Sequence, residues 1–370
     1  MRTLRNALIA ATMVAAITPD LQAQADRPGS PLVPGENSTP TRQGTRGANF
    51  LSIGVGARGN ALAGAVVSGV TGPQAWYWNP AGGAATESFS VGVSRQAMYG
   101  DLGISHNFAG LAMPLGAATV LGVSWTQLSA SDIDRSDPAF PFGNDPVKGD
   151  KFDFTSSAIG LHAARRLTDR LDVGIGAKYI SEGISDASIS WVGLDLGTQF
   201  RTGISGLVIG GALANIGSSS RVKGAAVERV LNTDDVSGQI TTVQYRTQDV
   251  ELPTAFRFSV GVDLLGGALS TFGQRGPHFL TGEVALNDAV DTDVQLAVGT
   301  EYSYANRFFL RGGKRFYNDD RATGSTGLYG LSGGVGLAIP LASRHLRFDY
   351  AYTSLGDLEN VQVFSFELGR

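Results

Sequence analysis

The sequence predicts an all-β fold, a transmembrane antiparallel β-barrel of about 14 strands that follows an N-terminal plug segment. Three observations support this fold class. The chain starts like an exported protein, and most of its length alternates between apolar residues and small or polar ones. The connections between the alternating segments are short and long in turn. Together these features indicate the outer membrane, with its lipid as one partner and one barrel formed by each chain.

Residues 1–25 match the pattern of a secretory signal peptide. Arg2 and Arg5 make its start basic, residues 7–17 are apolar, and residues 23–25 (Ala-Gln-Ala) fit a cleavage site. The apolar run is shorter than the roughly 20 residues that a membrane-spanning helix needs. We therefore expect this segment to be removed on export.

The composition excludes several classes of function. The chain has no cysteine, so it holds neither disulfide bonds nor a thiolate metal site. Its net charge is -4, which gives no basic field for nucleic acid. Acidic residues gather in predicted loops, but no loop has the 12-residue spacing of an EF-hand calcium site. We predict no cofactor and no metal.

Two segments precede the predicted barrel. Residues 26–48 are rich in Pro, Gly, Arg, Ser and Thr, which predicts a disordered lead-in. Residues 49–87 are rich in Gly and Ala, and we predict that they form the plug, with a short helix over 60–70. This segment ends in "QAWYWNPAGGA", which concentrates aromatic residues just before an Asn-Pro turn.

The barrel is predicted over residues 88–370. In "TAFRFSVGVDL", for example, Phe256, Phe258 and Val260 alternate with Arg257 and Ser259. In a barrel within lipid the apolar face points outward and the polar face lines the lumen. The predicted strands are 88–96, 101–114, 117–130, 153–167, 170–183, 187–201, 205–217, 253–267, 277–289, 293–304, 306–316, 327–340, 344–354 and 360–369.

The lengths of the connections support the same barrel. Such barrels have short periplasmic turns, longer extracellular loops and periplasmic termini. The two longest connections, 131–152 and 218–252, are the third and the seventh, whereas most even-numbered connections are tight. The eighth, 266–276, is an exception. We therefore predict that both termini are periplasmic. Residues 218–252 form either a hairpin that includes "QITTVQYRT" or a mobile flap.

Two motifs that could indicate catalysis lack the context that they need. Residues 54–59 match GxGxxG, but a dinucleotide site also needs a parallel βαβ unit and an acidic residue about 20 positions later. Residues 330–334 match GxSxG around Ser332, but that motif works at a sharp turn from strand to helix, and here it lies within a predicted strand. We predict that the protein is not an enzyme.

The segment Phe50–Ala85 resembles the N-terminal signature of the PorV/PorQ family of outer-membrane proteins, which belongs to the wider FadL-like superfamily. Shared features include the Gly-x-Gly-Ala-Arg run and the aromatic residue before Asn-Pro-Ala-Gly. Residues 60–62 (Asn-Ala-Leu) and Gly83 depart mildly from the family pattern. The last strand lacks the terminal aromatic residue that is usual in outer-membrane barrels. Three later segments, 252–264, 301–316 and 347–369, are also similar to strands of the family. The candidate plug residues are Gly54, Gly56, Arg58, Trp76, Tyr77, Trp78, Asn79, Pro80 and Gly82.

The resemblance implies a FadL-like barrel of about 14 strands whose N-terminal segment enters the lumen. It implies that the aromatic residues 76–78 form a wedge at the periplasmic mouth. Asn79 and Pro80 would then turn the chain into the first strand.

Two functions follow from the resemblance. In the first, the protein works like PorV in type IX secretion: it meets a translocon subunit and binds the C-terminal signal domains of cargo proteins on its outer loops. In the second, it passes hydrophobic small molecules through the barrel wall, as FadL does. The polar inward faces favour the first function. The candidate partner-binding residues on the loops are Phe140, Pro141, Phe142, Asp145, Arg229, Asp234 and Tyr245.

Overall fold

The computed structural model describes most of the chain after residue 43. The described residues are 44–100, 102–136, 140–143, 149, 151–234, 239–274, 276–292, 294–316, 329–342, 344–356 and 360–369, without the side chains of 229–242. The predicted signal peptide, 1–25, and residues 26–43 of the predicted lead-in lie outside this range.

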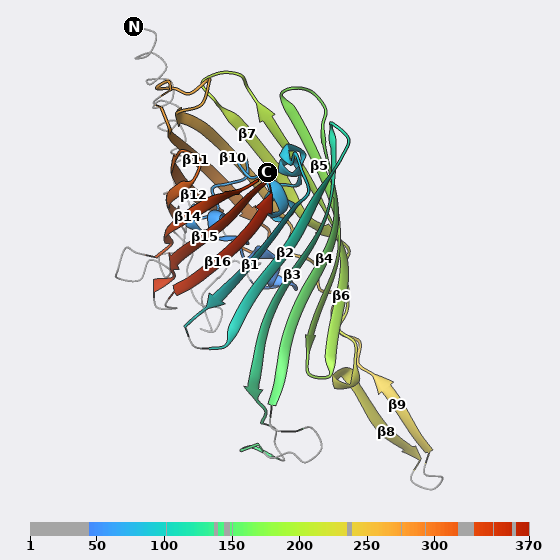
Figure 1. The fold of residues 1–370 in the computed structure, drawn as a ribbon. Helices are drawn as coiled ribbons and strands as arrows, with labels where there is room; N and C mark the ends of the chain where they lie inside the picture. The colour runs from blue at the N-terminus through green and yellow to red at the C-terminus, as the bar shows by residue number, and fades with distance from the viewer. Residues whose placement is uncertain are drawn as a thin grey trace, which may run out of the picture.

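Fourteen strands close into one antiparallel barrel, as the sequence predicts (Figure 1). The strands are β1 (Ser90–Met98), β2 (Ile104–Leu115), β3 (Thr119–Asp134), β4 (Lys151–Arg166), β5 (Leu171–Ile184), β6 (Ala187–Arg201), β7 (Val208–Gly217), β10 (Ala255–Leu265), β11 (His278–Ala289), β12 (Gln295–Tyr304), β13 (Phe308–Phe316), β14 (Leu331–Leu341), β15 (Arg344–Ser354) and β16 (Asn360–Gly369). Each strand pairs with its neighbours in sequence, and β1 pairs with β16 to close the barrel.

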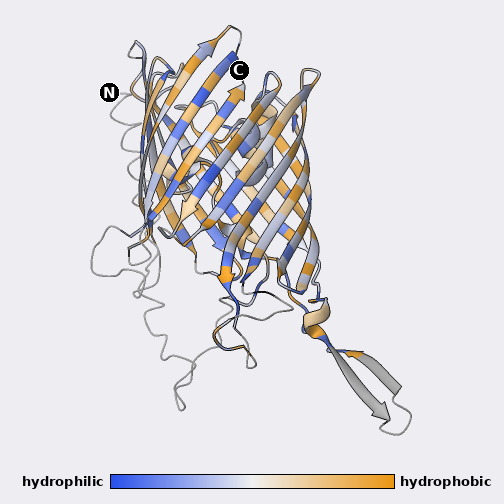
Figure 2. Cartoon of the chain, turned by 60° about the horizontal axis from the view of Figure 1, so that its bottom comes forward, coloured by the Kyte–Doolittle hydropathy of each residue, from blue (hydrophilic) through white to orange (hydrophobic). Residues whose placement is uncertain are grey.

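The period-2 alternation places apolar side chains outside and polar or small ones inside. On β6, Val192 and Leu194 are exposed on the outer face, whereas Trp191 and Asp195 are buried on the inner face. Figure 2 shows the same alternation of hydrophobic and hydrophilic residues along the barrel strands. This exterior suits lipid, because apolar side chains there need no hydrogen-bond partner. No helix in the described part of the chain is long and apolar enough to cross a membrane.

The long connections lie at one end of the barrel. They follow β3, β7 and β13, which are the third, seventh and eleventh barrel strands, as the sequence predicts. The connection after β7 contains η5 (Ala225–Val227) and a hairpin of β8 (Glu228–Asp234) and β9 (Gln239–Gln244), which projects away from the barrel (Figure 1). Of the two alternatives for this connection, the structure shows the hairpin.

Residues 44–89, here called the lumen segment, run inside the barrel before β1 begins. They contain η2 (Asn49–Ser52), α2 (Ala57–Ala61), η3 (Gly72–Gln74), α3 (Ala75–Trp78) and η4 (Pro80–Ala85). The helix expected over 60–70 is absent from the lumen segment. Ala63 and Gly64 have φ values of 55° and 91°, and this left-handed backbone ends α2.

The described chain starts and finishes at opposite ends of the barrel. The Gly47 backbone N–H donates to the carbonyl of Glu251, beside the long connection after β7. Gly369, by contrast, pairs with His345 near the tight turn between β14 and β15. The lumen segment therefore crosses the barrel from the long-loop end to the short-turn end.

Candidate functional site

The glycines near the start of the lumen segment leave room for one indole ring. A Cβ added at Gly54 or Gly59 would lie 2.7 Å from atoms of the Trp78 ring. Gly56 has a φ of 77°, and a Cβ there would overlap the side chain of Gln74. The GxGxxG run therefore serves close packing and a left-handed turn, which only glycine permits without strain.

Each aromatic residue of the predicted wedge donates one hydrogen bond to a backbone carbonyl. Trp76 Nε1 donates to Leu111 at 2.8 Å, Tyr77 Oη to Leu51 at 3.0 Å, and Trp78 Nε1 to Val55 at 3.0 Å. These bonds satisfy the polar atoms of rings that fill the lumen.

Trp76 lies near the short-turn end of the barrel. Its ring stacks on His162 at 5.1 Å between centroids, and it packs against Ala112 on β2 and Val120 on β3. A Cβ added at Gly122 would overlap the same ring. Trp78 packs against Val55 instead, so the three rings do not form a single layer.

Asn79 is fully buried and connects three parts of the fold. Its Oδ1 accepts from the Ala81 backbone N–H and caps η4, while its Nδ2 donates to the carbonyls of Val67 and Thr198. Pro80 occupies the first turn of η4, where a missing N–H costs nothing. Gly82 leaves room for the Val70 carbonyl. Asn79 thus ties the turn before β1 to the barrel wall.

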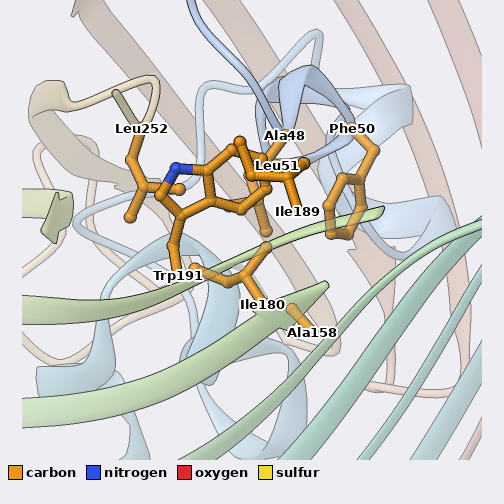
Figure 3. Packing of buried hydrophobic residues seen from close by; sticks show 8 residues of the cluster. All are labelled: Ala48, Phe50, Leu51, Ala158, Ile180, Ile189, Trp191 and Leu252. Atoms are coloured by element: carbon orange, nitrogen blue, oxygen red, sulfur yellow. The ribbon is translucent and has the colours of Figure 1, made fainter. Parts of the chain in front are cut away.

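An apolar cluster packs at the long-loop end of the lumen (Figure 3). Phe50 and Leu51 of the lumen segment pack with Ile180, Trp191 and Leu252. Trp191 Nε1 donates to the Val250 carbonyl at 2.8 Å, which holds the chain after β9 against the cluster. Ala48, which the sequence assigns to the lead-in, is buried in the same cluster.

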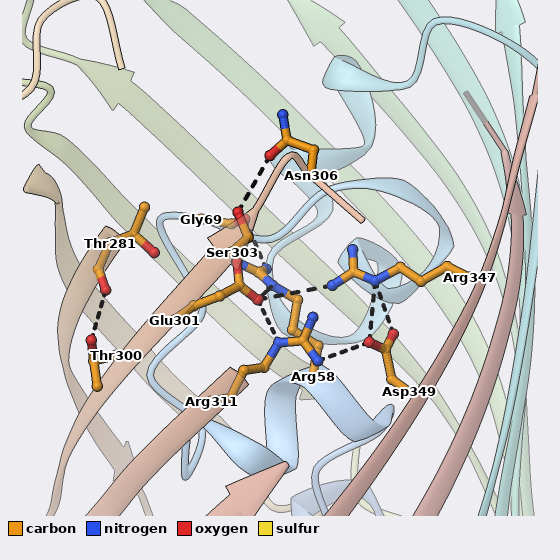
Figure 4. A network of polar contacts seen from close by, with 10 residues as sticks. All are labelled: Arg58, Gly69, Thr281, Thr300, Glu301, Ser303, Asn306, Arg311, Arg347 and Asp349. Carbon is orange, nitrogen blue, oxygen red and sulfur yellow. Dashed lines mark hydrogen bonds and ion pairs between the residues drawn. The ribbon is translucent and has the colours of Figure 1, made fainter. Parts of the chain in front are cut away.

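A buried network of charges holds the middle of the lumen segment (Figure 4). Arg58 of α2 pairs with Glu301 of β12 at 2.9 Å, and Arg311 of β13 contacts both Glu301 and Asp349 of β15. Arg347 also pairs with Asp349, at 3.0 Å.

Of this network, only Arg58 was a candidate residue from the sequence. The alternating pattern places Glu301, Arg311 and Asp349 on inward faces, which is a signal for lumen charges but not for their pairing. Further wall side chains bind the backbone of the lumen segment: Arg257 donates to the Tyr77 carbonyl at 2.6 Å. The wall therefore binds the lumen segment through polar contacts as well as through apolar packing.

The outer wall carries a groove of about 810 Å³, here called the wall groove. It crosses the seam where β1 meets β16 and extends from β14 to β3. Arg95 and Asn107 also border it. Its apolar lining includes Val93, Trp125, Leu337, Phe348, Phe364 and Phe366.

The strands behind the wall groove contact the lumen segment directly. The hydroxyl of Ser94 on β1 accepts from the Gly56 backbone N–H at 3.3 Å, and that of Ser365 on β16 accepts from Ala57 at 2.5 Å. Both serines also border the groove. A single layer of strands thus separates the groove from the start of α2.

Known proteins resemble this chain in their fold. No family model and no curated protein sequence match the chain. A TodX deltaS2S3 mutant, described as a monoaromatic hydrocarbon channel, aligns with a TM-score of 0.52 at 11% identity over 85% of this chain and 97% of that one. The Ralstonia pickettii toluene transporter TbuX aligns with a TM-score of 0.50 at 12% identity over 85% and 97% of the two chains. The chain has a FadL-like fold.

The toluene transporter TodX of Pseudomonas putida gives the same result, with a TM-score of 0.50 at 10% identity over 85% of this chain and 96% of that one. The barrel fold agrees with the fold that the sequence predicts. The finer resemblance to PorV and PorQ stays a prediction.

The loop residues expected to bind a partner are only partly described. Phe142 is 95% exposed and Phe140 36% exposed, with Pro141 between them. Tyr245 is 57% exposed just after β9. Asp145 lies outside the described residues, and so do the side chains of two more candidates, Arg229 and Asp234, whose backbones belong to β8.

The GxSxG motif and possible metal ligands are the remaining features that could carry chemistry. Ser332 lies at the start of β14 with its hydroxyl 3.1 Å from that of Thr353, in a strand and not at a turn into a helix. Among the described residues, no group of three or more His, Cys, Asp or Glu side chains could hold a metal ion.

Proposed function

We propose that the chain is a FadL-like barrel of the outer membrane that passes apolar small molecules between the lipid and its lumen. The observation that carries this proposal is the apolar wall groove, whose volume of about 810 Å³ is in the range of small-molecule sites. The structural neighbours are a monoaromatic hydrocarbon channel and toluene transporters, which agrees with this class of solute.

The packing of the lumen favours a lateral route. The apolar cluster of Phe50, Trp191 and Leu252 fills part of the long-loop end and leaves less room there for a solute. The wall groove is open to lipid and lies one strand layer from α2. Passage then requires a displacement of the lumen segment. Its polar contacts with the wall are separate bonds that water can replace. No covalent step is involved.

Uptake of labelled toluene tests the proposal, in a bacterial strain without hydrophobic-compound channels of its own. Ala109→Trp fills the groove, because Ala109 borders it and pairs with the exposed Val93. Ala163→Trp is the matched control, since Ala163 faces outward beside Leu121 on another part of the wall. We expect uptake with the wild type and the control, and at least a several-fold loss with Ala109→Trp. Equal uptake by all three, or none by any, would overturn the proposal.

A second candidate function is the receipt of secreted proteins through their C-terminal signal domains, as in type IX secretion. The exposed Phe142 and the projecting β8–β9 hairpin favour it, because both offer contact surface at the long-loop end. A pull-down of the tagged protein from its native membrane, with and without residues 131–152, tests this function. Secreted proteins that share a C-terminal β-domain should be captured only by the intact chain.

A further inference from the structure

We propose that the wall groove binds a lipid with an anionic phosphate headgroup, with the phosphate at Arg95 and an acyl chain along the aromatic lining. The proposal rests on the proposed function, because it names the class of molecule that the groove admits. Neither the fold nor the aromatic hydrocarbons of the structural neighbours point to such a lipid.

Arg95 is the first observation. It lies on the outward face of β1, where it pairs with Phe364 of β16 and Asn107 of β2. Its side chain is exposed, and within the described part of the chain it makes neither a hydrogen bond nor an ion pair. A cation that faces lipid is costly unless an anion or water meets it. The side chain therefore provides an unused positive charge at the groove.

The position of Arg95 within the groove is the second observation. β1 runs from the short-turn end at Ser90 to the long-loop end at Met98, so Arg95 lies nearer the long loops than Val93 does. Val93 pairs with Phe366, which in turn pairs with Phe348. The charge of the groove thus lies toward the long-loop end, and apolar side chains lie on its short-turn side.

The aromatic lining offers an extended surface for a chain. Phe348 and Phe366 pack edge to face with centroids 4.3 Å apart, and Tyr350 packs on Phe364 at 5.1 Å. Contacts of this kind stiffen the side chains, so that the groove keeps its shape. An acyl chain matches this surface, and its headgroup matches the cation beside it. A neutral aromatic hydrocarbon fills the apolar part but leaves Arg95 unpaired.

Trp125 provides a reporter inside the groove. The chain has four tryptophans, and Trp76, Trp78 and Trp191 are buried, whereas Trp125 is 37% exposed on the outer wall. Lipids with brominated acyl chains quench a tryptophan that they touch. The purified full chain is placed in phosphatidylcholine vesicles that contain the same small fraction of either brominated phosphatidylglycerol or brominated phosphatidylcholine. Trp125→Phe defines the signal from the other three rings.

We expect several-fold stronger quenching of Trp125 by brominated phosphatidylglycerol than by brominated phosphatidylcholine. Arg95→Gln should remove this preference, whereas Arg165→Gln, which removes an exposed cation on the outward face of β4, should keep it. Equal quenching by the two lipids in the wild type, or an unchanged preference in Arg95→Gln, overturns the proposal. If both lipids quench equally while Ala109→Trp still blocks toluene uptake, the lipid proposal fails and the transport function stands. If the preference holds and uptake is unaffected by Ala109→Trp, the lipid proposal stands and the transport function fails.

Discussion

Arg58 and Glu301, which lie 243 residues apart in the sequence, form a two-point ion pair inside the barrel. Nε meets Oε2 at 2.9 Å and Nη2 meets Oε1 at 3.2 Å. The same guanidinium donates through Nη1 to the Gly69 carbonyl at 3.0 Å, so it also connects α2 to a later part of the lumen segment. Because Glu301 also accepts from Arg311, one carboxylate joins the lumen segment to the wall. A single substitution at Glu301 therefore affects both the lumen segment and the wall.

Glu301→Gln should loosen the lumen segment without opening the barrel sheet. The change leaves Arg58 and Arg311 without their shared carboxylate, and removing one partner of a buried ion pair typically costs about 3–5 kcal/mol. We expect a higher single-channel conductance in planar bilayers and faster proteolysis within residues 44–89. Asp169→Asn, in an exposed turn, serves as the control. A variant with wild-type conductance and proteolysis would contradict this role for Glu301.

Gly122→Ala should destabilise the folded barrel through the Trp76 ring. A Cβ at Gly122 would overlap the indole, and the ring cannot move freely because it stacks on His162. Overpacking of this kind typically costs about 1–3 kcal/mol. The temperature at which the heat-modifiable gel band shifts should fall accordingly. Gly312→Ala is the matched control, since Gly312 also lies in a strand and a Cβ there meets nothing within 4 Å.

Acid should weaken the attachment of the chain that follows β9. Asp249 forms an ion pair with Arg221 at 2.6 Å beside the bridge between Ser220 and Val250. The hydrogen bond from Arg221 lowers the pKa of Asp249 below its ordinary value of 3.8. The stabilisation is therefore complete above the unfolded pKa and is lost as the pH falls through the lowered folded pKa.

Hydrogen exchange of the Val250 amide, corrected for the intrinsic rate, measures this effect. Protection should be constant from neutral pH to about pH 4 and decline below it, and Asp249→Asn should remove the pH dependence. Because both side chains are exposed to water, we expect a small change. Protection that increases toward low pH would show that the sign is wrong.

The fold could be predicted from the sequence because a period of two persists through fourteen strands. On β6 the alternation alone separates Val192 and Leu194 from Asp195, and the connection lengths fix the two ends. The partners of the lumen segment could not be predicted in this way. Pairing Arg58 with Glu301 depends on the height at which α2 sits in the lumen, and neither strand periodicity nor loop length determines that height.

The wall groove could not be predicted from the sequence pattern either. Val93 and Phe366 are outward apolar residues like many others, and their alternation does not show that the wall is hollowed across the β1–β16 seam. Arg95 did interrupt the apolar face of β1, which is a signal for an unusual site. Only the register of β1 with β16 and β2 shows which apolar and polar side chains surround it.

The last prediction concerns the side of the membrane on which the described chain begins. Both termini were expected to be periplasmic, but Met1 lies outside the described residues and Gly47 binds Glu251 at the long-loop end. Because the chain has no cysteine, single-cysteine variants report position cleanly. Asn49→Cys is suitable, since Asn49 is exposed beside the apolar cluster.

A maleimide that cannot cross the outer membrane should label Asn49→Cys in intact cells. Asp186→Cys, in the hairpin between β5 and β6, marks the long-loop end, and Asp169→Cys marks the short-turn end. Long loops are extracellular in barrels of this type, so Asn49→Cys should react together with Asp186→Cys. Asp169→Cys should react only after the membrane is permeabilised. If Asn49→Cys instead reacts only together with Asp169→Cys, the lumen segment enters the barrel from the periplasm and its contacts with Glu251 do not form in the membrane.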